Sequence, residues 1–246
     1  MPDVRFPETS WTDVVRAREL TPDGRRALSA LCEAYWFPVY AFIRRRGASA
    51  EEASDRTQEF FTRRLIEKNA LASFDRARGT RFRSWLLGCL KHHLCNEHAH
   101  ASTETAGGHV ILESLDGAAA EGRYQSEPAH ELTPERLYDR AFAESVLRRV
   151  VGEVQAKYAA AGKAALFEAL KGTLTANVPQ RPHGEVAVLL GRTEGDVRKA
   201  AFDLREVYKK KLRAEVARLV AEPDRAEGRE DLVREEALYL LHALED

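Results

Sequence analysis

The C-terminal half of the chain contains, at residues 183–213, the segment HGEVAVLLGRTEGDVRKAAFDLREVYKKKLR. Its first part has the apolar spacing of a short helix, at Val186, Ala187, Leu189 and Leu190. Gly191 follows at a position where helices commonly end in a left-handed residue, and Thr193 can cap a next helix that has Asp196 in its first turn. The second helix has an apolar stripe at Val197, Ala201, Leu204 and Tyr208. The segment therefore predicts two helices joined by a glycine turn, the arrangement of a helix-turn-helix.

Basic side chains surround this turn and the second helix. Between Arg192 and Arg213 there are eight basic and four acidic residues, a net charge of +4. In a helix-turn-helix the second helix enters the major groove with its N-terminal residues toward the bases, while other basic residues hold phosphates. The candidate DNA-binding residues are Arg192, Thr193, Glu194, Arg198, Lys199, Arg205 and Lys210. An ordinary helical hairpin with a solvated charged face has the same spacing, so this segment alone leaves both interpretations open.

A second well-marked helix is predicted over Ser49–Lys68. Ser49 and Glu52 have the spacing of a capping box. An apolar stripe follows, at Ala53, Thr57, Phe60, Phe61 and Leu65. Two adjacent phenylalanines are more than one narrow stripe requires, so one is a candidate partner contact, with core packing as the alternative. The candidate contact residues of this helix are Asp55, Gln58, Glu59 and Phe60.

A basic segment leads into a further helix, predicted over Phe82–His100. Five basic residues and one acidic residue between Arg76 and His100 give a net charge of +4. Basic side chains beside a tryptophan suit single-stranded nucleic acid, since the charges contact phosphates and the bases stack on rings. The candidate residues are Arg81, Arg83, Trp85, Lys91, His92 and Asn96. The alternative is that Trp85 belongs to the core and that the arginines are solvated.

The same helix offers zinc ligands as another interpretation. They are Cys89, His92, His93, Cys95, His98 and His100. Ligands along a single helix cannot converge tetrahedrally on one ion without a second element. We therefore expect no metal and no other cofactor.

The order of periodic segments and breaks predicts an all-α protein with two helical domains joined by a flexible linker. The linker is rich in glycine and proline and has little sustained periodicity. The predicted parts are an N-terminal extension (1–24), a helical domain (25–102), the linker (103–137), a second helical domain (138–220) and an acidic extension (221–246). From Glu222 to Asp246, nine acidic residues and three arginines give a net charge of −6. We expect this acidic end to approach the basic segment 192–213 or to bind a partner protein.

Composition limits the classes of function. The 246 residues are 44% hydrophobic, which is enough to bury a core. The formal net charge of −1 does not indicate nucleic-acid binding, so only the local basic segments indicate it. No run of about 18 apolar residues predicts a membrane span, and no export signal is found at the N-terminus. Three cysteines, a sparse and odd number, favour a reducing cytoplasm over a disulfide scaffold. Neither paired carboxylates, a phosphate-binding glycine loop nor a nucleophile motif is found, so we expect no enzymatic activity.

Four stretches together resemble the extracytoplasmic-function sigma factors of RNA polymerase, in particular the long planctomycete and myxobacterial type. They are LCEAYWFPVYAFIRRRG at Leu31–Gly47, DRTQEFFTRRL at Asp55–Leu65, RGTRFRSWLLGCLKHHLCNE at Arg78–Glu97 and VAVLLGRTEGDVRKAAFDLRE at Val186–Glu206. Their order and spacing across both helical bodies are specific, whereas no single stretch is. The linker and both ends lie outside the resemblance.

The resemblance implies a role for each candidate set. Asp55, Gln58, Glu59 and Phe60 are expected to dock on core RNA polymerase. The set on the Phe82–Glu97 helix, with Arg81, is expected to bind the −10 element of promoter DNA, and the helix-turn-helix to bind the −35 element. An anti-sigma or other regulatory protein is a further expected partner, and no membrane is expected.

Two departures from the family pattern reduce the expected number of phosphate contacts. The Phe82–Glu97 helix is followed by His98-Ala99-His100 where arginines are usual, and Asp203 stands where a basic residue is usual. Affinity for DNA depends largely on such contacts. The leading hypothesis is thus a sigma factor that directs promoter recognition and melting. The alternative is a sigma-like regulator that binds polymerase or a partner without initiating transcription by itself.

Overall fold

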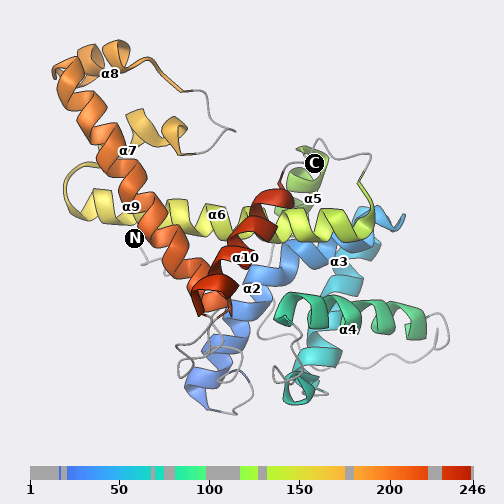
Figure 1. Cartoon of the computed structure of the whole chain (residues 1–246). Coiled ribbons are helices and arrows are strands. Elements are labelled where there is room, and N and C mark those ends of the chain that lie inside the picture. The colour runs from blue at the N-terminus through green and yellow to red at the C-terminus, as the bar shows by residue number, and fades with distance from the viewer. Residues whose placement is uncertain are drawn as a thin grey trace. The chain divides into compact units, whose positions relative to one another are not determined.

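The computed structural model describes Ala17 and residues 21–67, 70–74, 81–97, 117–126, 132–174, 180–220 and 229–244, and every regular element in these ranges is a helix (Figure 1). The elements are α2 (Pro22–Arg45), α3 (Ala50–Glu59), η1 (Phe60–Glu67), η2 (Ala70–Ser73), α4 (Phe82–Glu97), α5 (Gly117–Ser126), α6 (Pro134–Ala160), α7 (Ala164–Leu170), η4 (Lys171–Thr173), α8 (His183–Leu190), α9 (Glu194–Val220) and α10 (Arg229–His242). The predicted all-α class is confirmed. None of these helices has the length and apolar character that a membrane crossing requires.

The chain divides into two compact units. Unit 1 comprises Met1–Ala143 and Arg218–Asp246, and unit 2 comprises Glu144–Ala217. The divisions fall inside α6 and α9, which contribute residues to both units. The predicted linker, 103–137, contains all of α5 and the first residues of α6, and these helical residues belong to unit 1.

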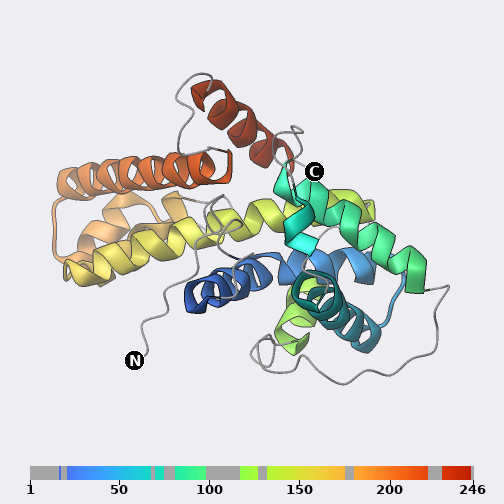
Figure 2. The same ribbon diagram turned by 90° about the horizontal axis from the view of Figure 1, so that it is seen from below.

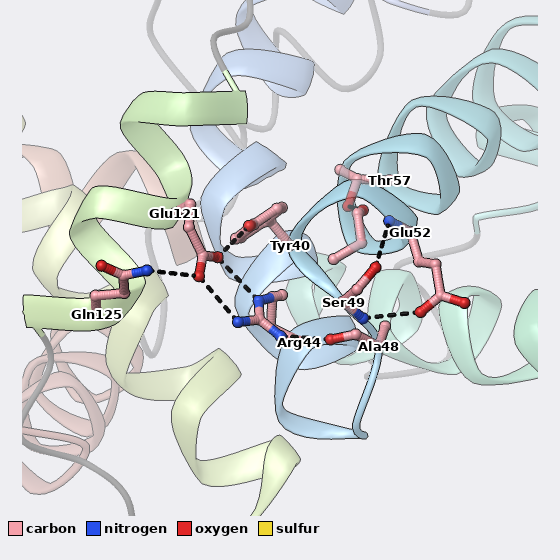
Figure 3. Close-up of polar contacts among 9 residues, drawn as sticks. Tyr40, Arg44, Ala48, Ser49, Glu52, Thr57, Glu121 and Gln125 are labelled. Atoms are coloured by element: carbon pink, nitrogen blue, oxygen red, sulfur yellow. Dashed lines mark hydrogen bonds and ion pairs between the residues drawn. The ribbon is translucent and has the colours of Figure 1, made fainter.

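Helix α3 begins with the predicted capping box (Figure 3). The Ser49 hydroxyl accepts a hydrogen bond from the Glu52 backbone N–H at 3.2 Å, and the Glu52 carboxylate accepts one from the Ser49 backbone N–H at 2.8 Å. These bonds satisfy N–H groups that have no partner in the first turn of a helix. The predicted apolar stripe behind the cap is buried, with exposed fractions of at most 2% at Ala53, Thr57, Phe60, Phe61 and Leu65.

Both phenylalanines of this stripe are buried because their segment contacts aromatic rings from two other helices. The Phe61 ring lies 5.8 Å from the ring of Trp36 in α2, and the Phe60 ring lies 5.6 Å from the ring of His93 in α4. A helix with neighbours on two sides needs a wider apolar arc than a surface helix does. The adjacent pair at positions 60 and 61 supplies that wider arc.

Helix α5 is held against α2 by the carboxylate of Glu121 (Figure 3). Arg44 donates to this carboxylate from Nε and Nη2, both at 2.9 Å, and the Tyr40 hydroxyl and the Gln125 amide also donate to it. Arg44 donates in addition to the carbonyl oxygen of Ala48. The Arg44 hydrogen bonds hold the pKa of Glu121 at about 2. A part of the predicted linker is therefore attached to unit 1 by a specific ionic contact.

In unit 2, helices α6, α7, α8 and α9 share one apolar core (Figure 1). Its buried members are Val150, Val154, Leu166, Phe167, Leu170, Val186, Ala187, Val197, Ala201, Leu204 and Tyr208. Ion pairs connect α6 with α9 at the edge of this core, between Arg149 and Glu215 at 3.0 Å and between Glu153 and Lys211 at 2.5 Å. Figure 2 shows α9 lying alongside α6 within the unit.

Candidate nucleic-acid interface

The turn between α8 and α9 has the geometry that the sequence predicts. Gly191 has φ 61° and ψ 38°, in the left-handed region. The backbone N–H groups of Gly191 and Arg192 donate to the carbonyl oxygens of Val188 and Ala187, at 3.3 and 2.9 Å. This pair of bonds is a Schellman termination, for which glycine is favoured because its backbone enters the left-handed region without strain.

Helix α9 begins directly after this turn with the predicted cap. The Asp196 backbone N–H donates to the Thr193 hydroxyl at 3.2 Å, and that hydroxyl donates to the Asp196 carboxylate at 2.7 Å. The Thr193 hydrogen bonds hold the pKa of Asp196 below its usual value. The predicted stripe of α9 is buried, since Val197, Ala201 and Leu204 are 0% exposed and Tyr208 is 9% exposed. Helices α8 and α9 are thus joined by the predicted glycine turn, and the side of α9 opposite its buried stripe is exposed.

That outward side carries most of the residues predicted to contact DNA. Six of the seven are exposed, namely Arg192, Thr193, Glu194, Arg198, Lys199 and Lys210, and Arg205 is half-buried. The surface has mixed charge, because the Arg198 guanidinium lies 2.7 Å from the Glu194 carboxylate and Asp203 is exposed on the same helix. The Thr193 hydroxyl is engaged in the cap, so its main role here is structural.

Three large apolar side chains on the helix-turn-helix are also exposed. Val188 is 85% exposed, Leu189 is 60% exposed and Phe202 is 56% exposed. Leu189, one of the apolar residues from which α8 is predicted, is exposed because this short helix turns Val186 and Ala187 to the core. Phe202 follows Arg198 by four residues and therefore lies one helical turn beyond it. Its place outside the buried stripe of α9 is the sequence signal that would have identified it.

The arginines at the start of α4 are engaged within unit 1. Arg83 is only 6% exposed, and both Arg81 and Arg83 donate to the carboxylate of Glu236 in α10. The Tyr239 ring lies 3.7 Å from the Arg83 guanidinium. The structure therefore contradicts a solvent-facing Arg83, because a carboxylate from the acidic end neutralises it. Helix α10, which forms part of the acidic end, thus has Arg81 and Arg83 as ionic partners within unit 1. The predicted approach of the acidic end to segment 192–213 stays a prediction.

Trp85 lies half-buried among aromatic rings of unit 1. The rings of Phe74 and Phe82 have their centres 5.2 and 5.4 Å from that of Trp85. Such rings pack edge to face or offset and stabilise one another. The partly exposed Trp85 ring is compatible both with the predicted stacking role and with the core alternative.

The remaining −10 candidates lie further along α4. Lys91 forms an ion pair with Glu135 at 2.8 Å, and both side chains are close to half exposed. His92 is exposed, and its Nδ1 lies 2.8 Å from Nη2 of Arg64. The side chain of Asn96 lies outside the described residues. Trp85, Lys91 and His92 thus share one helix and are accessible, whereas Arg83 is not.

The predicted polymerase-docking residues also include both accessible and buried side chains. Asp55 is exposed, and Gln58 and Glu59 are half-buried, with the Glu59 carboxylate 2.6 Å from Arg63. Phe60 is 0% exposed. The structure contradicts a partner-facing Phe60 side chain, because both rings of the Phe60–Phe61 pair are needed in the core.

The described ranges contain no group of three metal-ligating side chains. Cys89 is half-buried, and burial raises the pKa of its thiol. His98 and His100, which the zinc interpretation included, lie outside the described residues.

Comparison of the chain with protein-family models, with curated proteins and with solved structures gave no match.

Proposed function

We propose that this protein is a sigma-type transcription initiation factor, which binds core RNA polymerase and directs it to promoter DNA by binding alone. The observation that carries the proposal is the helix-turn-helix of unit 2. Its second helix buries one apolar stripe and presents Arg198 and Lys199 near its N-terminal end, and Arg192 is exposed in the turn that precedes it. Residues at this end of a recognition helix are the ones that reach base edges in the major groove.

The composition of that surface fits a −35 contact. Arg198 can donate two hydrogen bonds to guanine, and the exposed Phe202 ring can contact a thymine methyl group. Lys209 and Lys210, further along α9, are exposed and suit phosphate contacts. The two kinds of contact would provide sequence preference and affinity, respectively.

Helix α4 supports a second contact, with the single-stranded −10 element. Lys91 and His92 are accessible, and Trp85 offers a partly exposed ring in a rigid aromatic cluster. Binding unstacked bases to such rings offsets the cost of unpairing them, so strand opening needs no catalytic residue. Asp55, Gln58 and Glu59 are the α3 residues that we assign to polymerase docking. The protein would carry out all of these steps in the cytoplasm.

The direct test is transcription by purified core RNA polymerase with and without the protein, on DNA selected from a random pool by the complex. We expect transcripts that start at a fixed distance from the selected sequence. Arg198→Ala should weaken selection at one −35 position. Lys163→Ala is the matched control, because it removes an exposed positive charge of unit 2 outside the helix-turn-helix. A protein that neither binds polymerase nor selects any sequence refutes the proposal.

A second candidate is a sigma-like regulator that binds polymerase without initiating transcription. The pairing of Arg198 with Glu194 and the exposed Asp203 favour it, because acidic groups on this surface repel phosphates. Stable polymerase binding without transcript formation would select this second function.

A further inference from the structure

Two arginines before and within the first turn of α4 share one carboxylate, that of Glu236 in α10. Arg81 and Arg83 each donate to a different oxygen of this group. The Glu236 side chain is 1% exposed, that of Arg83 is 7% exposed and that of Arg81 is 33% exposed. Two guanidinium groups directed at two oxygens of one anion form a site that suits a phosphate as well as a carboxylate.

The Glu236 carboxylate belongs to α10, a helix that buries few apolar side chains. On α10 the buried side chains are Val233, Glu236 and Leu240. Leu232, Leu238 and Leu241 remain 44%, 57% and 54% exposed. An isolated helix of this length is marginal in water, so α10 depends on its docking contacts for stability. Besides these apolar residues and the ionic contact, the Tyr239 ring packs on the Arg83 guanidinium and the Tyr239 side chain is hydrogen-bonded to Asp139, so polar contacts form a large part of the attachment.

The carboxylate does not satisfy Arg83 completely. Nη1 of Arg83 bonds to Glu236, whereas its Nε is buried and makes no hydrogen bond in the described structure. A buried donor without an acceptor costs free energy. The guanidinium is therefore stabilised when a ligand with more acceptor oxygens replaces the carboxylate. The backbone phosphate of a nucleic acid has two charged non-bridging oxygens, as a carboxylate has, and two weaker ester oxygens in addition, so it offers Arg81 and Arg83 the same two anionic acceptors and further acceptors beside them.

We propose that Arg81 and Arg83 form a binding site for a nucleic-acid backbone phosphate, which Glu236 occupies in the free protein, so that α10 and single-stranded DNA compete for it. This inference rests on the proposed function and adds a regulated phosphate contact to its −10 surface. Trp85, on which an unpaired base would stack, follows Arg83 by two residues on α4.

The exchange replaces one anion by another. Removing Glu236 alone would leave two desolvated guanidinium groups without a counter-charge, which is costly. An incoming phosphate restores the counter-charge, so α10 is expected to leave when DNA arrives and to return when DNA dissociates.

The test uses the full chain and a fluorescein-labelled single-stranded DNA of mixed sequence. Glu236→Gln removes the competing charge, and Leu240→Ala loosens α10 without changing any charge. Glu235→Gln is the matched control, because it changes the net charge equally but removes only an exposed ion pair with Arg81, 3.5 Å long and 65% exposed on the Glu235 side. Exposed pairs of this kind contribute little. Fluorescence anisotropy gives the affinity, hydrogen exchange of residues 229–242 gives the state of α10, and circular dichroism checks the fold.

We expect E236Q and L240A each to bind the oligonucleotide about ten-fold more tightly than the wild type, within the range of typical coupling between sites. E235Q should stay close to the wild type. In the wild type, the amides of α10 should lose protection when the oligonucleotide binds.

Equal affinity of all folded variants, or an α10 that stays protected in the DNA complex, overturns the inference and leaves the proposed function standing. If no variant binds the oligonucleotide, with or without core polymerase, the proposed function fails and the inference fails with it.

Discussion

Replacing Glu121 by glutamine tests whether α5, which lies in the predicted linker, is fastened to unit 1. In the wild type the carboxylate receives two hydrogen bonds from Arg44, one from Tyr40 and one from Gln125. The substitution keeps the size of the side chain but removes its charge. Arg44 is then left without its counter-charge, although it is only 21% exposed.

The magnitude follows from the burial of the pair. Removing one partner of a fully buried ion pair costs about 3–5 kcal/mol, whereas an exposed pair contributes about 0.2–1 kcal/mol. The side chains of Arg44 and Glu121 are 21% and 17% exposed, between these limits. We therefore expect a loss of about 2 kcal/mol in the free energy of unfolding, because hydrogen bonds to charged groups contribute about 1.5–3 kcal/mol.

Urea denaturation followed by tryptophan fluorescence measures this loss in unit 1, because Trp36 and Trp85 belong to that unit and residues 144–217 of unit 2 include no tryptophan. The contribution of Glu121 also has a defined pH dependence. Its pKa is lowered from 4.5 to about 2 by the hydrogen bonds from Arg44. A carboxyl group whose pKa is lower in the folded than in the unfolded state stabilises the fold at pH values above its unfolded-state pKa. This stabilisation is lost as the pH falls through the folded-state pKa. The difference in stability between wild type and E121Q should therefore close between pH 4.5 and 2.

Gln125→Ala is the control in the same cluster, since it removes one exposed hydrogen bond at 3.1 Å and should change stability by less than about 0.5 kcal/mol. A double-mutant cycle of E121Q with Arg44→Met isolates the coupling between the two charges. A coupling below about 0.5 kcal/mol, or an E121Q difference that persists unchanged at pH 2, would refute the reasoning.

The remaining predictions concern the buried Phe60, the docking residues of α3 and the exposed side of α9. Phe60→Ala should lower the free energy of unfolding by about 3–5 kcal/mol, because the ring is fully buried. The double variant Asp55→Ala, Gln58→Ala should stay within about 0.5 kcal/mol of the wild type and lose retention on immobilised core polymerase; normal retention would contradict the docking assignment. Asp203→Arg should tighten binding to promoter DNA and steepen its salt dependence, because one more phosphate contact releases one more counterion. Arg198→Ala should reduce discrimination at one base pair by about 1–3 kcal/mol, measured with single-substitution promoters, and unchanged preference would argue against base contact.

The local features of both units follow from the sequence. The capping box at Ser49, the glycine turn at Gly191 and the cap at Thr193 are each set by residues within a few positions of one another. The buried stripes of α3 and α9 follow from helical periodicity, which identifies the apolar side of a helix without reference to its neighbours. The all-α class is the sum of such local signals.

The burial and contacts of a charged side chain depend on partners that are far away in the sequence. The sequence predicts an Arg83 that is available to DNA, whereas its burial in the structure requires Glu236, 153 residues further on. Helix α5 looked like part of a flexible linker, and its attachment requires Arg44, 77 residues earlier. Periodicity carries no information about such pairs, because burying a charge is favourable only once the opposite charge is in place.

The Phe60–Phe61 pair shows the difference between what the sequence determines and what the tertiary structure decides. The sequence placed both rings near one apolar stripe and left open which of them faces a partner. The neighbouring aromatic residues decided it, since Trp36 contacts one ring and His93 contacts the other. The sequence thus determined which side of each helix is apolar, and only the tertiary structure decided how wide that side is, because the width depends on how many neighbours pack against the helix.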